Sequence, residues 1–381
     1  MGSCISTRTN PETDRHHGAN AETDLHHVPS LPQTEGGIIK AANLECFCFS
    51  ELAAATGHFN KENLLGLGEF GVVYRGWIDE HSLKATSPTK GMAIAVKKLR
   101  HDSCQGQQEW LTEIKYLGQL CHPNLVKLIG YCLEDKNRLL VYEFMPKGSL
   151  DRHLFEAGDS TFQILSWDQR IKVALSIAKA LAFLHHEVHA IHRDVKTSNI
   201  LLDLNYNAKL SDFGLAKDGS VNSRSHVTAR VLGTEGYYAP EYMESGHLST
   251  RCEVYSFGVV LLELLCGRPA IDTERPDEET NLVQWARPCL DNAYTIFRIL
   301  DARSLGHFSK YSVLKTAKLA SLCVLSEPTS RPTMKEVVEA LEKLQEPNEN
   351  EGSSDRVSKS KSNKMQYATQ PCRVKPNSYP A

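Results

Sequence analysis

The 381-residue sequence lacks the features that mark several classes of protein. Its 11 cysteines are odd in number and scattered without a C-x-x-C pair, which argues against a disulfide framework or a structural zinc site and predicts a reduced, intracellular protein. Its net charge is only −3, whereas a nucleic-acid-binding surface needs an excess of positive charge. No apolar run approaches the roughly 18 residues of a membrane-spanning helix, and no apolar core of a secretory signal follows Met1.

The first six residues nevertheless predict contact with a membrane. They fit the myristoylation pattern M-G-x-x-x-[ST], in which Gly2 becomes N-terminal after removal of Met1. One acyl chain anchors only marginally, and residues 1–47 hold three basic against six acidic side chains, which cannot attract anionic lipid. We therefore expect S-palmitoylation of Cys4 and an acylated, largely disordered tail over residues 1–58 on the cytoplasmic face of the cell membrane. The alternative is an unmodified tail.

A glycine-rich segment follows this tail. Gly66, Gly68 and Gly71 form a G-x-G-x-x-G, which dinucleotide-binding folds and kinases both use. A dinucleotide fold needs a helix at the last glycine, but residues 72–77 are β-branched and aromatic, as in a strand. The chain also has no G-x-x-x-x-G-K-[ST], so a P-loop NTPase is set aside. The motif predicts a β-hairpin tip over phosphates, while a glycine-rich hairpin without a ligand stays open on this motif alone.

A fixed cation is predicted shortly after the hairpin. Residues 93–97 form an apolar strand that ends in Lys97, where an ammonium group could meet the phosphates of a nucleotide. A helical stretch follows, with Trp110, Ile114 and Leu117 on one face. A carboxylate on this helix could orient Lys97, and spacing alone does not choose between Glu109 and Glu113.

Three further motifs come later, in a fixed order. They are His192-Arg193-Asp194 with Asn199, Asp212-Phe213-Gly214, and Ala239-Pro240-Glu241. With them the chain resembles the eukaryotic protein kinases, and within these the acylated, membrane-associated group of plant receptor-like cytoplasmic kinases, over roughly residues 59–346. The resemblance implies an α+β, bilobal kinase fold. It has an antiparallel β N-lobe with one helix over about 59–145, a mostly helical C-lobe over about 146–346, and a disordered tail over 347–381.

The resemblance also implies the roles of the site residues. Lys97 would bind the α- and β-phosphates of ATP and Glu113 would hold Lys97, while Asn199 and Asp212 would bind Mg²⁺ through the hard oxygen ligands that it prefers. Asp194 would orient the substrate hydroxyl and accept its proton, and Lys196, a lysine typical of serine/threonine kinases, would steady the transferring phosphate. The implied ATP contacts are Leu65, Gly66, Gly68, Gly71, Val73, Ala95, Lys97, Glu143, Met145 and Leu201.

Hydroxyl residues between Asp212 and Glu241 suggest regulation by phosphorylation. Thr228 is our first candidate and Ser225 our second. Thr234, also a candidate, belongs by resemblance to the substrate-binding loop, where it would contact Asp194 and Lys196.

Three departures from the family pattern stand out. Ala229 replaces a second hydroxyl residue, Glu235 replaces an aromatic one, and Glu253 replaces the aspartate that binds the backbone of the His-Arg-Asp turn. Because a buried interior responds to a single methylene, Glu253 could misplace that turn. The sequence alone predicts that Glu253→Asp keeps or raises activity.

The sequence therefore predicts a membrane-tethered serine/threonine kinase that uses ATP and Mg²⁺ and acts on protein substrates. An upstream receptor-like kinase as partner, and a relay in plant immune or developmental signalling, are implied by the resemblance only. The alternative is a weak or inactive kinase fold that acts as a scaffold or decoy, which Glu253 and Ala229 keep open.

Overall fold

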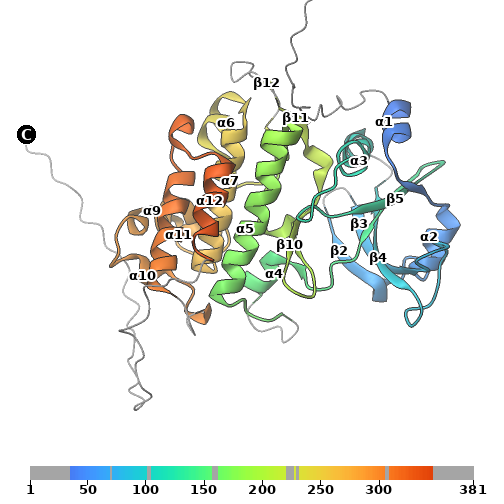
Figure 1. The fold of residues 1–381 in the computed structure, drawn as a ribbon, viewed down its shortest axis with the longest axis horizontal. Helices are drawn as coiled ribbons and strands as arrows, with labels where there is room; N and C mark the ends of the chain where they lie inside the picture. Colours follow the sequence, from blue (N-terminus) through green and yellow to red (C-terminus); the bar gives the residue numbers. More distant parts are fainter. Residues whose placement is uncertain are drawn as a thin grey trace, which may run out of the picture. The chain divides into compact units, whose positions relative to one another are not determined.

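The structure, a computed structural model, describes residues 35–68, 71–100, 104–156, 162–219, 227–228, 231–304 and 309–345. The expected acylation sites Gly2 and Cys4, the candidate phosphosite Ser225, Ala229 and the tail expected over 347–381 lie outside these residues. Within them, a lobe built on a mixed β-sheet precedes a mostly helical lobe, which confirms the α+β fold class (Figure 1).

A six-stranded sheet forms the framework of the N-lobe. Its order is β1-β5-β6-β4-β3-β2, and every neighbouring pair is antiparallel except β1 and β5. The expected antiparallel sheet is thus present with one additional parallel strand. The strands are β1 (Glu45–Cys46), β2 (Leu64–Leu67), β3 (Gly71–Ile78), β4 (Met92–Leu99), β5 (Leu128–Glu134) and β6 (Asn137–Glu143).

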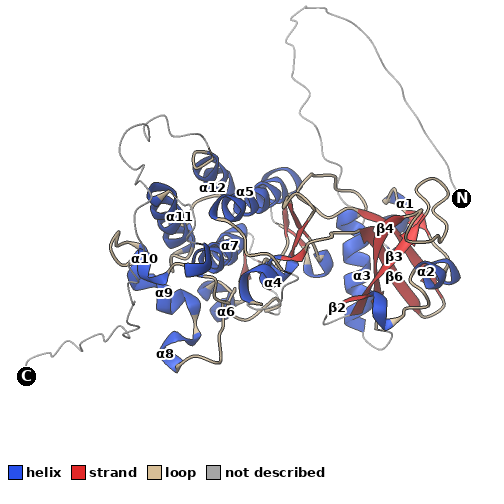
Figure 2. Ribbon diagram, turned by 90° about the horizontal axis from the view of Figure 1, so that it is seen from below, coloured by secondary structure: helices blue, strands red, loops and turns tan. Residues whose placement is uncertain are grey.

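Apolar side chains cover both faces of this sheet because successive residues of a strand point to opposite sides. Ile94, Val96 and Val141 pack in one cluster with Leu52 of α2 (Phe49–Ala55). The alternate residues Leu140 and Tyr142 belong to the second cluster, together with Trp110 and Ile114 of α3 (Cys104–Leu117). Helices α2 and α3 accordingly lie on opposite sides of the sheet (Figure 2).

The described structure includes elements before residue 59, within the residues 1–58 expected to form a largely disordered tail. Helix α1 (Glu35–Ala41), strand β1 and helix α2 all precede residue 59. The reason is that this segment buries apolar side chains, among them Ile38, Phe47 and Leu52, against the sheet and α3. Asn43 also donates its backbone N–H to the carbonyl of Gly118, just past the end of α3 (3.3 Å).

Helices build the second lobe around a buried centre. In α7 (Thr250–Cys266) almost every side chain is buried, as its apolar sequence predicts, and α11 (Lys310–Cys323) and α5 (Trp167–Phe183) pack against it. Helix α12 (Met334–Glu342) packs on α5 and begins with the expected capping box between Thr333 and Glu336. The remaining helices are α4 (Leu150–Phe155), α6 (Pro240–Ser245), α8 (Asp277–Thr280), α9 (Leu282–Leu290) and α10 (Ile296–Ile299).

Short strands in the second lobe hold the loops that carry the motifs. The loop of residues 192–199 lies between β8 (Ala190–Ile191) and β9 (Ile200–Leu202), and β10 (Ala208–Leu210) directly precedes the Asp212 motif. Beyond that motif, β11 (Lys217–Asp218) pairs with β8, so both ends of the Asp212 segment are attached to the same lobe. The other short strands are β7 (Gly148–Ser149), β12 (Val227–Thr228) and β13 (His247–Leu248).

Candidate active site

The predicted lysine joins carboxylates from two elements far apart in the sequence. Lys97 Nζ lies 2.6 Å from Glu113 Oε1 on α3 and 2.7 Å from Asp212 Oδ1 of the second lobe. Burial by itself lowers the pKa of the Lys97 ammonium, but the charges of Asp212 and Glu113 outweigh it and raise the pKa above its usual range. Lys97 is therefore a permanent cation at the meeting point of the two lobes.

The structure also decides between the two glutamates of α3. Glu113 is fully buried, and burial raises its pKa while the neighbouring Lys97 lowers it in part. Glu109 instead accepts a hydrogen bond from Gln105 Nε2 (2.9 Å), and burial raises the pKa of Glu109 to about 7. Glu113 thus forms the ion pair.

One hydrogen-bond partner of Glu113 belongs to no sequence motif and was not predicted. Tyr142, the residue before Glu143 on β6, donates its hydroxyl to the second carboxylate oxygen of Glu113. Both oxygens of Glu113 are therefore used, one by Lys97 and one by Tyr142. This arrangement fixes the rotamer of the carboxylate that orients Lys97.

The three loop glycines have different physical requirements. A Cβ built on Gly71 would lie 2.6 Å from the carbonyl oxygen of Lys98, so this glycine is needed for packing of β3 on β4. Gly66 has nothing within 4 Å, and a Cβ on Gly68 would make only an ordinary contact at 3.5 Å. Among the described residues of the hairpin, Gly66 therefore leaves open space and Gly68 makes no close contact, so a phosphate could approach the backbone there.

The other expected ATP contacts lie on strands or just after one. Val73 is directly opposite Lys97 in the β3–β4 register, and Ala95 lies two residues before Lys97 on β4. Leu65 is on β2, Leu201 is on β9, and Met145 follows β6. Glu143 forms an ion pair with Lys209 on β10 (2.7 Å), which ties the segment between the lobes to the second lobe.

The predicted catalytic loop brings its polar groups together around Asp194. Asn199 Nδ2 donates to Asp194 Oδ2 (2.9 Å), and Lys196 Nζ lies 2.9 Å from the same oxygen. Thr234 donates its hydroxyl to Asp194 Oδ1 (2.6 Å) and accepts a hydrogen bond from Lys196 (2.8 Å). The contacts expected of Thr234 are therefore present. Because the Asn199 nitrogen is directed to Asp194, its amide oxygen is left for another donor or a cation.

Glu253 makes the contact that its aspartate counterpart was expected to make. Its Oε1 accepts the backbone N–H of Arg193 (2.6 Å), a residue with a left-handed φ of 73°. Its Oε2 lies 2.7 Å from His185 Nε2, in the π-helical turn Leu184–Val188 that follows α5. The glutamate therefore uses both oxygens to hold a strained turn. The displacement of the His-Arg-Asp turn that the longer side chain could cause is not seen.

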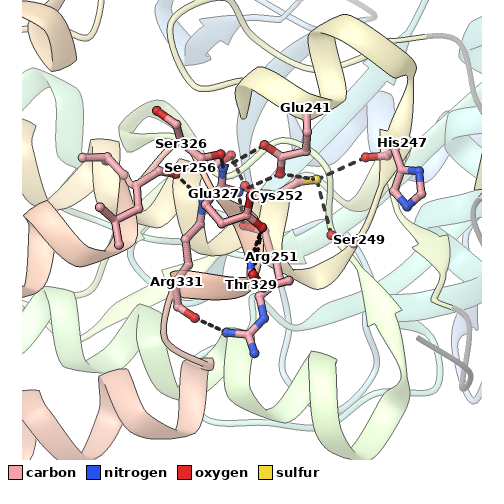
Figure 3. A network of polar contacts seen from close by, with 12 residues as sticks. Glu241, His247, Ser249, Arg251, Cys252, Ser256, Ser326, Glu327, Thr329 and Arg331 are labelled. Atoms are coloured by element: carbon pink, nitrogen blue, oxygen red, sulfur yellow. Dashed lines mark hydrogen bonds and ion pairs between the residues drawn. The ribbon is translucent and has the colours of Figure 1, made fainter. Parts of the chain in front are cut away.

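A buried network attaches Glu241, at the end of the segment that begins at Asp212, to the helical lobe (Figure 3). Arg331 donates from both terminal nitrogens to the two carboxylate oxygens of Glu241 (2.7 Å each), and its side chain is fully buried. Cys252 on α7 approaches the same carboxylate through its thiol (3.4 Å). Such a bidentate pair fixes the orientation of both side chains.

A second buried carboxylate supports the loop that contains Thr234. Glu263 on α7 accepts hydrogen bonds from the Tyr237 hydroxyl (2.7 Å) and from the backbone N–H of Ala270 (3.0 Å). The hydroxyls of Tyr237 and Thr197 lie 3.3 Å apart, which links this network to the catalytic loop. Burial raises the pKa of Glu263 to about 8.

A two-lobed fold in which a buried lysine–glutamate pair meets an Asp-Phe-Gly aspartate beside an Asp–Lys–Asn cluster is that of a protein kinase. Residues 59–341 match the family model for protein tyrosine and serine/threonine kinases. The chain is 54% identical to the probable serine/threonine-protein kinase PBL9 of Arabidopsis thaliana, over 91% of this chain and 86% of the relative.

Two further relatives agree with this match. The chain is 54% identical to receptor-like cytoplasmic kinase 176 of Oryza sativa subsp. japonica, over 91% of this chain and 88% of the relative. It is 51% identical to the serine/threonine-protein kinase BIK1 of Arabidopsis thaliana, over 91% and 90%. The chain therefore belongs to the protein kinase family, and within it to the plant receptor-like cytoplasmic kinases. It is a serine/threonine kinase, and its family uses ATP and a divalent metal.

Among the described residues, no helix has the length and apolar character needed to cross a membrane.

Proposed function

We propose that this chain transfers the γ-phosphate of ATP to serine and threonine hydroxyls of proteins, with Asp194 as the base. The observation that carries the proposal is the aliphatic hydroxyl of Thr234, held 2.6 Å from Asp194 Oδ1 and 2.8 Å from Lys196 Nζ. A substrate hydroxyl that displaces Thr234 would meet the same acceptor and the same cation. Asp194 then orients the hydroxyl and takes its proton, while Lys196 balances negative charge on the transferring group.

The remaining groups position the nucleotide. Lys97, held by Glu113, is the cation for the α- and β-phosphates, and we assign the backbone at Gly66 and Gly68 to the same phosphates, because neither glycine is crowded where a Cβ would lie. Asp212 and the amide oxygen of Asn199 are hard oxygen ligands, and we assign Mg²⁺ to them. When bound, the metal neutralises phosphate charge.

We further propose that the kinase is tethered to the cytoplasmic face of the cell membrane through acyl groups on Gly2 and Cys4. In this location it relays signals from an upstream receptor-like kinase, in plant immune signalling, after phosphorylation at Thr228 or Ser225. The likeness to a protein named receptor-like cytoplasmic kinase 176 and the N-terminal pattern M-G-x-x-x-[ST] support this proposal. In the structure, Thr228 pairs with His247 between β12 and β13.

The proposed transfer is tested with purified full chain, radiolabelled ATP and a generic protein substrate. Asp194→Asn and Lys97→Met should each reduce incorporation by at least about 10²-fold. Asp291→Asn, at an exposed ion pair with Lys318, is the control and should match the unmodified chain. Equal incorporation in all four proteins would refute the kinase assignment and favour the scaffold alternative.

The tether is tested separately by membrane fractionation of plant cells that express the chain. Gly2→Ala should move it from the membrane to the soluble fraction, and Cys4→Ser should do so in part, because one acyl chain binds only marginally. A chain that stays on the membrane after both substitutions would refute acylation as the anchor.

A further inference from the structure

A cluster of three polar side chains joins α3 to the segment that follows the Asp-Phe-Gly motif. Lys115 Nζ lies 2.7 Å from Asp218 Oδ2 and 2.9 Å from Asp218 Oδ1. The Tyr116 hydroxyl donates to Asp218 Oδ1 (2.7 Å). We call these residues the Asp218 cluster. It has no part in the proposed transfer step.

Burial makes this cluster more than a surface ion pair. Tyr116 is 1% exposed, and its ring lies 6.4 Å from that of Phe213 in the Asp-Phe-Gly motif. The side chain of Lys115 is 15% exposed and that of Asp218 is 55% exposed. Without Asp218 the buried Tyr116 hydroxyl would lose its acceptor, and a buried polar group without a partner is costly.

The position of the cluster relates it to the catalytic lysine. Lys115 and Tyr116 lie in the same turn of α3 as Glu113, and Asp218 lies six residues after Asp212. Glu113 and Asp212 both bind Lys97. The last turn of α3 is therefore attached to segment 212–218 at two points, through Lys97 at one and through Asp218 at the other.

The segment that holds Asp218 is itself fixed to the second lobe. Asp218 is paired with Ala190 and Lys217 with Ile191 between β11 and β8. Between the two attachment points, a Cβ built on Gly214 would lie 3.0 Å from Glu109 Cβ, so α3 packs directly on this backbone. Burial raises the pKa of Asp218, but hydrogen bonds from Lys115 and Tyr116 outweigh it and lower the pKa, so the carboxylate is charged at neutral pH.

We infer that Asp218 is a positioning residue, which holds α3 through Lys115 and Tyr116 so that Glu113 stays on Lys97. This inference deepens the proposed function and rests on it. Asp218 touches no reacting group, and it acts only through the placement of Glu113. Loss of the cluster frees the last turn of α3, and Lys97 then loses the carboxylate that orients it for the phosphates.

Asp218→Asn tests the inference, since it keeps the shape of a half-exposed side chain and removes its charge. Asp291→Asn is the matched control, because Asp291 is bound by Lys318 and by the hydroxyl of Ser321, each at 3.1 Å, outside the site. We expect hydrogen exchange of the α3 amides to rise about 5- to 30-fold in Asp218→Asn and not in the control, and kcat to fall by a similar factor. KM for the protein substrate should stay within about twofold, since no substrate contact changes.

Two further variants separate positioning from general destabilisation. Asp218→Glu should restore most of kcat, because it keeps the charge that Lys115 and Tyr116 require. In a Glu113→Gln background, Asp218→Asn should lower kcat no further, since its effect passes through Glu113. Unchanged exchange in α3, or losses that add in the double variant, would overturn the inference.

Failure of the inference and failure of the proposed function give different results. If the unmodified chain transfers no more phosphate than Asp194→Asn, the proposed function fails, and exchange in α3 still decides whether Asp218 holds the helix. If the unmodified chain is active and Asp218→Asn matches it in exchange and kcat, the kinase proposal stands and the role of Asp218 is refuted.

Discussion

Shortening Glu253 by one methylene is a sharp test of how the catalytic loop is held. Its Oε1 and Oε2 contact Arg193 N at 2.6 Å and His185 Nε2 at 2.7 Å, and the side chain is 3% exposed. Glu253→Asp withdraws the carboxylate by about 1.5 Å, the length of one carbon–carbon bond. From that position it reaches at most one of its two partners.

The expected loss follows from the group left without a partner. A buried N–H or imidazole without its acceptor costs about 1–3 kcal/mol. If Arg193 N–H is the group that is lost, its left-handed backbone can relax and move Asp194, the next residue. A shift of about 1 Å in a catalytic group can cost on the order of 10²-fold. We therefore expect kcat to fall by between about 10-fold and 10²-fold, opposite to the prediction from the sequence alone.

The assay measures phosphate transfer to a generic protein substrate at saturating ATP, beside thermal unfolding of each variant. Glu253→Gln is the control, because it keeps the length of the side chain and an oxygen for Arg193 N–H, and it should lose less activity than Glu253→Asp. A folded Glu253→Asp protein with unchanged or raised kcat would refute this reasoning. It would show that α7 or the loop adjusts without cost.

Three further predictions concern stability. Arg331→Ala leaves the Glu241 carboxylate without its partner and should lower the free energy of unfolding in urea by about 3–5 kcal/mol, and a loss below about 1 kcal/mol would contradict the role of this pair. Glu263 has a folded-state pKa raised by burial from 4.5 to about 8, so the folded state binds more protons between these values and stability falls as pH rises. Glu263→Gln should remove this slope, up to about 1.4 kcal/mol per pH unit, and an unchanged slope would refute the assignment. Gly118→Ala puts a Cβ 2.7 Å from the Cβ of Ala42, just after α1, and should lower the free energy of unfolding by about 1–3 kcal/mol. Gly36→Ala, with nothing within 4 Å, should not destabilise the protein, and equal melting curves for the two variants would contradict this packing.

Much of the site was predictable because its motifs are short and contiguous. The glycine hairpin, Lys97, and the Asp194–Asn199 loop are each defined by residues a few positions apart, and their order along the chain carries the resemblance to the protein kinases. Helix α7 was predictable because a segment that is apolar on nearly all sides has to be buried. The helices and the strand within residues 35–58 were not predicted, because their few apolar side chains gain stability only by packing on distant strands and on α3.

The partners across the sequence could not be derived from local pattern. Spacing left Glu109 and Glu113 equivalent, and only the packing of α3 places Glu113 at Lys97. Tyr142 and His185 belong to no motif, yet each completes the hydrogen bonding of a buried glutamate.

By itself, the sequence determined that this protein is a two-lobed kinase, because several short motifs occur in the order typical of that family, and the resemblance implies which groups carry its chemistry. Only the tertiary structure decided how those groups are held, including the use of both oxygens of Glu253 and the attachment of α3 to Asp218. The physical reason is that a hydrogen bond or ion pair depends on distances of about 3 Å between atoms. Such distances between residues far apart in the chain exist only after folding.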